Sequence, residues 1–127
     1  MQELQRYPAL PFSLDEQQRH CRSEHLSKLR HLYPIPGPIP DQVMESTHHC
    51  EGRDGFKIPV KIYKPVKLSA SGAPVYIAIH EGGWSMGDLT DEDLNCRMFA
   101  RDLDMVCVNV DYRLLPENEW PAPVNDW

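Results

Sequence analysis

The sequence predicts an α/β fold in which a β-hairpin is followed by a β-α-β unit. Two apolar runs, Val75–Ile79 and residues 105–110, have the length of strands and no polar alternation, as strands covered on both faces have. A segment that begins with acidic residues, as helices do, lies between them. Upstream, residues 56–63 alternate apolar side chains with polar or small ones, which is typical of a strand with one exposed face. These observations favour one sheet with a helix packed against it.

The composition limits the classes of protein to which this chain can belong. The chain has 127 residues, of which 41% are hydrophobic, which is enough for the core of one domain. Its formal charge of −6, with no basic stripe, argues against a nucleic-acid partner. The longest apolar run, Val75–Ile79, is too short to span a bilayer, and the first residues lack the apolar core of a secretory signal. We therefore expect a cytoplasmic protein with no membrane span, no metal site and no cofactor.

Residues 1–40 are predicted to form a unit of their own. Ser13 and Glu16 make a capping box, which predicts a helix from about residue 14 to residue 31. The helix carries few apolar side chains, so we expect it to lie over another part of the molecule rather than inside a core. The proline-rich segment 34–40 excludes helix and interior strand, and we interpret it as a linker to residues 41–127.

The hairpin is predicted from three consecutive segments. Residues 42–50 resemble a weak strand, residues 52–55 a turn and residues 56–63 a better strand. Pro59 lacks a backbone N–H group, so it suggests an edge or bulged position in the second strand.

The β-α-β unit follows from residue 75 onward. Thr90 is expected to be the N-cap of a helix that runs to about residue 103, because acidic residues follow it directly. The expected inner face of this helix carries Leu94, Met98, Phe99 and Leu103. A right-handed crossover would make the two apolar strands parallel members of one sheet. Another helix is expected to begin near residues 124–127.

The glycine-containing loop after Val75–Ile79 is the segment most indicative of chemistry. It contains His80, Glu81, Gly82, Gly83 and Trp84. Glycine lets backbone N–H groups approach a small ligand closely, and such groups can stabilise a developing negative charge. The loop therefore predicts an anion hole built from main-chain donors.

Two further motifs accompany this loop, and together they resemble a known family. They are Gly87-Asp88 and Asp111-Tyr112-Arg113-Leu114-Leu115-Pro116-Glu117. The set resembles the hormone-sensitive-lipase-like esterases of the α/β-hydrolase fold, which carry H-G-G-G-W after the third strand and D-Y-R-L-A-P-E after the fourth. The resemblance covers about residues 56–127. It implies that residues 41–127 are the N-terminal part of an α/β-hydrolase domain with an incomplete sheet, and that residues 1–40 supply a cap helix.

The resemblance also implies a function and roles for the loop residues. The activity is hydrolysis of a small-molecule ester by a serine nucleophile, with the N–H groups of Gly82 and Gly83 in the oxyanion hole. His80 supports the loop in that family rather than acting as a general base. Trp84 either lines an acyl pocket or fills the core under the loop, and the sequence leaves both open. Glu81 stands where the family usually has glycine, which requires its carboxylate to point away.

Ser85 lies in a literal G-x-S-x-G sequence, which is the pattern of a nucleophile elbow. An elbow needs a strand running directly into the first glycine and a helix starting directly after the serine, and residues 80–82 and 86–89 separate Ser85 from both. All six histidines lie at or before position 80, whereas the triad histidine of this fold follows its serine. We therefore interpret Ser85 as a loop serine and not as a nucleophile.

The chain ends before the positions at which the family has its nucleophile, acid and histidine. We therefore expect a fragment of a carboxylic-ester hydrolase that is inactive alone, the alternative being a non-catalytic binding or truncated protein. Asp111 and Arg113 are expected to form an ion pair at the end of a strand, with Tyr112 beneath. In this fold a further strand pairs beside Val75–Ile79, so we expect an open, aggregation-prone edge there.

Overall fold

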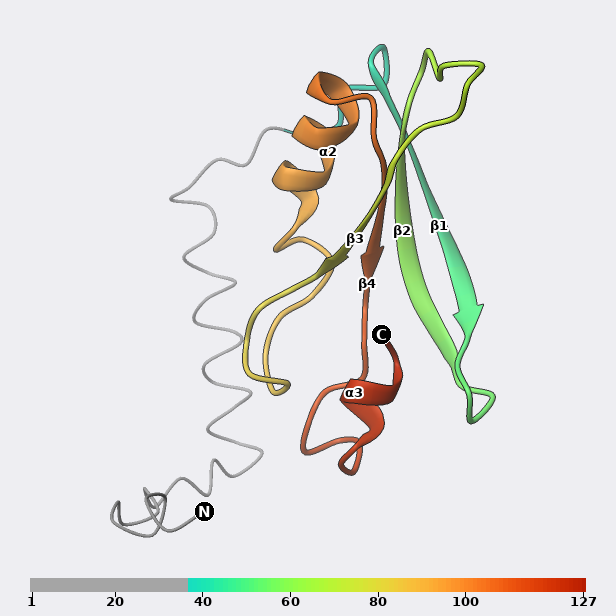
Figure 1. Cartoon of the computed structure of the whole chain (residues 1–127). Coiled ribbons are helices and arrows are strands. Elements are labelled where there is room, and N and C mark those ends of the chain that lie inside the picture. The colour runs from blue at the N-terminus through green and yellow to red at the C-terminus, as the bar shows by residue number, and fades with distance from the viewer. Residues whose placement is uncertain (1–36) are drawn as a thin grey trace, which may run out of the picture.

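A computed structural model describes residues 37–127, which form a mixed sheet of four strands and two helices (Figure 1). In chain order the elements are β1 (Val43–Glu51), β2 (Lys57–Pro65), β3 (Val75–Ile79), α2 (Asp93–Asp102), β4 (Val106–Val110) and α3 (Ala122–Asn125). The helix predicted at residues 14–31 lies outside the described residues.

The strands lie in the order β1-β2-β4-β3. β1 and β2 pair as an antiparallel hairpin, and β2 pairs antiparallel with β4. β3 and β4 are parallel neighbours with Ile77 opposite Val108, and α2 is the crossover between them. The predicted hairpin and the predicted parallel pair are therefore confirmed.

The main core lies between α2 and one face of the sheet. Its fully buried members are Val43, Tyr63, Ala78, Cys96, Ala100 and Cys107. The rings of Tyr76 and Phe99 meet edge to face beside it, with centroids 5.0 Å apart. Strand alternation explains this set, because every second residue of β3 and β4 points toward the helix.

The predicted start of α2 is wrong by two residues. The helix begins at Asp93 with Glu92 at the N-cap position, and Thr90 lies in the preceding turn. The Asp88 carboxylate accepts hydrogen bonds from the Thr90 N–H group at 2.7 Å and from its hydroxyl at 2.6 Å. Because Asp88 holds Thr90 in this local turn, the hydroxyl does not cap the helix.

The predicted inner face of α2 is also partly wrong. Met98 and Leu103 are exposed, whereas Cys96, Arg97 and Ala100 are the buried residues of the helix. The small side chains of Cys96 and Ala100 let α2 approach the sheet closely. The charge of the Arg97 side chain is neutralised by acidic neighbours.

Those neighbours form a network of ion pairs between α2 and the hairpin. The Arg97 guanidinium donates to both carboxylate oxygens of Glu45, at 2.6 and 3.1 Å, and to Asp93 at 3.1 Å. Lys61 contacts both carboxylates at 2.9 Å. The Tyr63 hydroxyl also donates to Asp93. The two cations and two anions balance, which allows Arg97 to be buried.

Pro59 lies in the interior strand β2, so the expectation of an edge or bulged position is wrong. Its carbonyl accepts a hydrogen bond from the Asp111 N–H group at 3.0 Å, just beyond the end of β4. In an antiparallel ladder the N–H and C=O of one residue face the same neighbour. The donor that proline lacks is therefore missing at the end of the β2–β4 ladder, and the β1–β2 ladder loses nothing.

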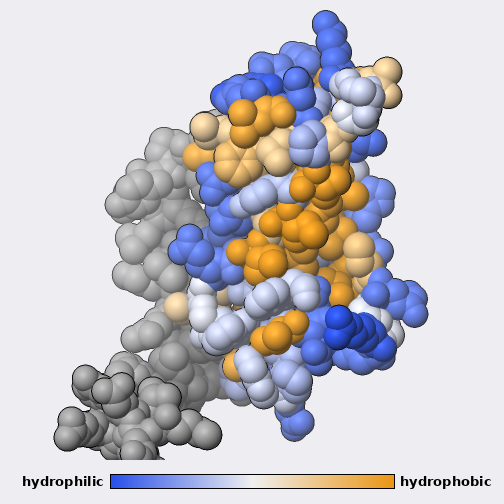
Figure 2. All heavy atoms as spheres, in the orientation of Figure 1, coloured by the Kyte–Doolittle hydropathy of each residue, from blue (hydrophilic) through white to orange (hydrophobic). Residues whose placement is uncertain are grey.

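The second face of β3 is uncovered by any described residue. Val75 is 63% exposed and Ile77 is 59% exposed, and both lie on the face opposite α2. The half-buried Val108 of β4 continues this surface, and Figure 2 shows hydrophobic side chains gathered over the strands. The prediction that β3 is covered on both faces is wrong for residues 37–127. β3 pairs only with β4 there, so the expected open edge is present.

Candidate functional site

The loop after β3 turns through successive left-handed residues. Gly82, Gly83 and Trp84 have φ angles of 122°, 60° and 61°. A Cβ atom on Gly82 would lie 2.0 Å from the Met86 carbonyl oxygen, so only glycine fits there. The turn is closed by the Ser85 N–H group, which donates to the Gly82 carbonyl at 3.2 Å. The sequence therefore builds a compact turn directly after the strand.

The N–H groups of Gly82 and Gly83 donate to no acceptor within residues 37–127. Two adjacent main-chain donors in a fixed turn can bind one small anion. The Glu81 side chain is exposed, so its carboxylate is hydrated rather than packed within the turn. The arrangement is chemically suited to holding a negatively charged oxygen.

His80 lies beneath this turn and is only 3% exposed. Its ring stacks on that of Tyr112 with centroids 4.3 Å apart, and its Nδ1 atom is 2.8 Å from the Glu81 carbonyl oxygen. The Tyr112 hydroxyl donates to the His80 carbonyl at 2.9 Å. A Cβ atom on Gly87 would lie 2.1 Å from His80 Nδ1, so the end of the loop closes tightly over the imidazole.

Trp84 is 41% exposed, so it does not fill the core. Its carbonyl accepts a hydrogen bond from the Leu115 N–H group at 2.7 Å, which ties the loop to the segment after β4. Its ring meets that of Trp120 edge to face, with centroids 5.5 Å apart. Sequence reasoning missed Trp120, although a large aromatic residue in a proline-rich loop is a signal that can be read from the sequence.

Ser85 belongs to the turn itself. Its Oγ atom donates to the Gly82 carbonyl at 3.3 Å. The imidazole of His80 uses Nδ1 within its own loop, and its Nε2 atom has no partner among the described residues. His80 therefore makes no hydrogen bond to Ser85 of the kind that joins a serine nucleophile to its general base.

The expected ion pair between Asp111 and Arg113 is wrong. Arg113 instead donates to both oxygens of the fully buried Asp126 carboxylate, at 2.6 and 2.9 Å, and contacts Asp54 at 2.8 Å. The hydrogen bonds that Arg113 donates to Asp126 raise the pKa of Arg113. Burial raises the pKa of Asp111. Asp126 outcompetes Asp111 because it meets the guanidinium with two oxygens in a planar, bidentate geometry.

The two buried thiols are poor nucleophiles. Burial raises the pKa of Cys96 to about 12 and raises that of Cys107. A thiol that stays protonated at neutral pH does not attack a carbonyl group efficiently. No group of three or more His, Cys, Asp or Glu residues in the described part of the chain can hold a metal ion.

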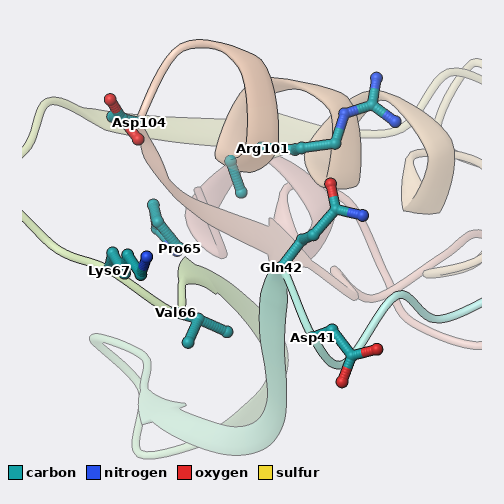
Figure 3. A pocket seen from close by; sticks show the side chains of 8 residues that line it. Asp41, Gln42, Pro65, Val66, Lys67, Arg101 and Asp104 are labelled. Carbon is teal, nitrogen blue, oxygen red and sulfur yellow. The ribbon is translucent and has the colours of Figure 1, made fainter.

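A cavity of about 270 Å³ lies at the other end of β4 from the glycine loop (Figure 3). Its lining combines acidic, basic and apolar side chains, from Asp41, Gln42, Pro65, Val66, Lys67, Ala100, Arg101 and Asp104. None of the predicted site residues lines it, and its lining includes no serine, threonine, cysteine or histidine. The candidate site is therefore the loop and not this cavity. No helix within residues 37–127 is long and apolar enough to cross a membrane.

Comparisons with known proteins agree with the fold and with the motifs. Residues 76–127 match a family model described as alpha/beta hydrolase fold. The carboxylesterase NlhH of Mycobacterium tuberculosis is 37% identical over 101 residues, which are 79% of this chain and 31% of NlhH. The carboxylic ester hydrolase LipN of the same organism is 44% identical over 71 residues, 55% of this chain and 18% of LipN.

A solved structure extends the likeness to almost the whole chain. A bacterial heroin esterase superposes with a TM-score of 0.71 at 27% identity, over 98% of this chain and 38% of the esterase. The chain thus spans less than two fifths of the length of each of these relatives. By its sequence and its fold, the chain has an incomplete α/β-hydrolase fold and is similar to the hormone-sensitive-lipase-like esterases.

Proposed function

We propose that this chain supplies the oxyanion hole of a carboxylic-ester hydrolase that acts on small-molecule esters. The observation that carries the proposal is the pair of unused N–H groups on Gly82 and Gly83, held in a left-handed turn over the buried His80. Its carboxylesterase relatives support the same reaction class.

The chemistry of ester hydrolysis explains why such a turn is useful. Attack on the ester carbonyl turns a neutral oxygen into an oxyanion, and donors fixed in advance stabilise that charge without reorganising. Loss of one such donor lowers the rate by about a hundred- to a thousandfold in enzymes of this kind. Two main-chain donors of this type would be provided by Gly82 and Gly83, with His80 and Trp84 supporting the loop around them.

We further propose that the 127-residue chain does not hydrolyse esters by itself. Ser85 donates its hydroxyl hydrogen to the Gly82 carbonyl and so serves the turn that presents the donors. The test is hydrolysis of a short-chain p-nitrophenyl ester by the chain and by its Ser85→Ala variant. We expect no turnover above the buffer rate in either protein, and turnover that disappears in Ser85→Ala would contradict the proposal.

The anion site itself is tested by titrating the ¹⁵N-labelled chain with acetate. We expect saturable downfield shifts of the Gly82 and Gly83 amide protons, because a carboxylate oxygen accepts from both. Acetamide, which has the same shape without charge, should shift them less. The Gly55 amide is an internal reference, since its N–H group already donates to the Gly52 carbonyl at 3.0 Å. If acetate leaves both loop amides unchanged, they do not form an anion site.

A further inference from the structure

Trp84 and Trp120 form an exposed aromatic pair directly beside the two donors. Trp84 follows Gly83 in the chain. Trp84 is 41% exposed and Trp120 is 59% exposed. Their planes meet at 77°, so the pair presents a ring face and a ring edge nearly at right angles. Large aromatic side chains that stay exposed in contact with each other are typical of a binding surface.

Both rings are carried by backbone that is fixed by hydrogen bonds. The Trp84 carbonyl accepts from the Leu115 N–H group at 2.7 Å. Trp120 precedes α3, and the Ala122 N–H group donates to the Glu119 carbonyl at 2.9 Å across it. The loop after β3 and the segment after β4 therefore hold the pair from two sides.

We propose that Trp84 and Trp120 form a subsite for a flat aromatic group, attached to the carbonyl carbon whose oxygen lies on the N–H groups of Gly82 and Gly83. The inference rests on the proposed anion site and names its ligand class: aryl carboxylates and esters of aryl carboxylic acids. A third ring can stack on the free face of one indole and meet the edge of the other, which are the preferred geometries of aromatic pairs. A saturated ring of the same size has no such quadrupole to orient it.

The experiment compares benzoate, cyclohexanecarboxylate and acetate in titrations of the full chain, read from the amide protons of Gly82 and Gly83 and the indole N–H signals of Trp84 and Trp120. We expect benzoate to bind about two- to tenfold more tightly than either other carboxylate, which is the range of a single aromatic contact. We expect Trp120→Ala to remove this advantage while acetate affinity stays unchanged, and Trp120→Phe to retain part of it. Trp127→Ala is the matched control, because Trp127 is 49% exposed and lies outside the pair.

The outcomes separate this inference from the proposed function. Equal affinities for the three carboxylates, with both glycine amides shifting, would leave the anion site intact and overturn the aromatic subsite. The aromatic subsite is also overturned if cyclohexanecarboxylate binds as tightly as benzoate. That comparison uses the unaltered chain, so it does not depend on the folding of a variant. If no carboxylate shifts the glycine amides, the proposed function fails and the subsite fails with it.

Discussion

The Tyr112 hydroxyl donates a hydrogen bond of 2.9 Å to the backbone carbonyl of His80, and the two rings stack with centroids 4.3 Å apart. One residue begins the glycine loop after β3, and the other follows the end of β4. Residues 32 positions apart are thus joined by one polar and one apolar contact. This link explains how the segment after β4 holds the turn in place.

Removal of the Tyr112 hydroxyl should weaken this link selectively. Tyr112→Phe keeps the stacked ring but leaves the carbonyl of the buried His80 without its donor, so we expect the free energy of unfolding to fall by about 1–3 kcal/mol. Urea unfolding followed by circular dichroism measures it. Tyr76→Phe is the control, since the Tyr76 hydroxyl has no hydrogen-bond partner in the described part of the chain. It should change stability by less than about 0.5 kcal/mol. Equal effects would argue against the link.

Gly87→Ala should distort the loop far more than a comparable glycine replacement elsewhere. Gly87 has a φ angle of 111°, and an added Cβ atom would lie 2.1 Å from His80 Nδ1. Gly55 in the hairpin turn has a φ angle of 83°, but an added Cβ atom meets nothing within 4 Å. We expect a loss of about 3 kcal/mol or more in Gly87→Ala and of about 1 kcal/mol in Gly55→Ala, measured by urea unfolding. If both variants lose a similar amount of stability, the positive φ angle explains the loss and the contact with His80 does not contribute.

The Glu45–Arg97 pair should contribute more to stability than the exposed Glu51–Lys57 pair. Both partners of the first pair have side chains less than 15% exposed, whereas those of the second are more than 60% exposed. Glu45→Gln leaves a buried guanidinium short of its counterion, so the free energy of unfolding should fall by about 3 kcal/mol. Glu51→Gln should lower it by less than about 1 kcal/mol. Equal losses in urea unfolding would contradict this assignment.

The same network predicts how stability depends on pH. The hydrogen bond from Arg97 lowers the pKa of Glu45 from its ordinary value of 4.5, and Lys61 adds to the effect. Burial raises the pKa of Asp93, but hydrogen bonds from Lys61 and Tyr63 outweigh it, so the net pKa lies below 3.8.

Carboxyl groups with a depressed pKa in the folded state bind fewer protons there than in the unfolded chain. Their stabilisation is complete above the ordinary pKa and is lost as the pH falls through the folded value. We therefore expect the free energy of unfolding to decrease below about pH 4.5. In Glu45→Gln the decrease should be smaller. If stability falls as steeply with pH in this variant as in the original chain, Glu45 does not contribute to the pH dependence.

The exposed face of β3 should control the solubility of the isolated chain. An apolar strand with an unpaired edge is a template for association with another copy. Ile77→Lys places a charge on that face, so we expect higher solubility and less light scattering at equal concentration. Leu103→Lys is the matched control, because Leu103 is also exposed, at 58%, but lies at the end of α2. Equal improvement in both variants would point to net charge rather than to the strand.

Much of the fold could be predicted because the relevant signals are local. Apolar runs of strand length gave β3 and β4 to within one residue, and their order with a helix between them required a parallel pair. The glycine loop was recognisable because its own residues, rather than contacts with distant residues, determine its backbone conformation. These features depend on a few neighbouring side chains.

The remaining features depend on contacts between distant residues. Arg113 pairs with Asp126 rather than with Asp111 because α3 brings the buried carboxylate of Asp126 next to it. The buried side of α2 includes Arg97, which periodicity assigns to solvent unless Glu45 is known to lie opposite. Trp120 became a candidate only when the fold placed it against Trp84.

The most direct test of the central claim is the acetate affinity of the Gly82 and Gly83 amides in the original chain, in Gly87→Ala and in Gly55→Ala. The account predicts saturable shifts of both amide protons in the original chain and in Gly55→Ala. It predicts their loss in Gly87→Ala, where the loop no longer closes over His80. Shifts that are absent from the original chain, or that survive unchanged in Gly87→Ala, would contradict a preformed oxyanion hole at this turn.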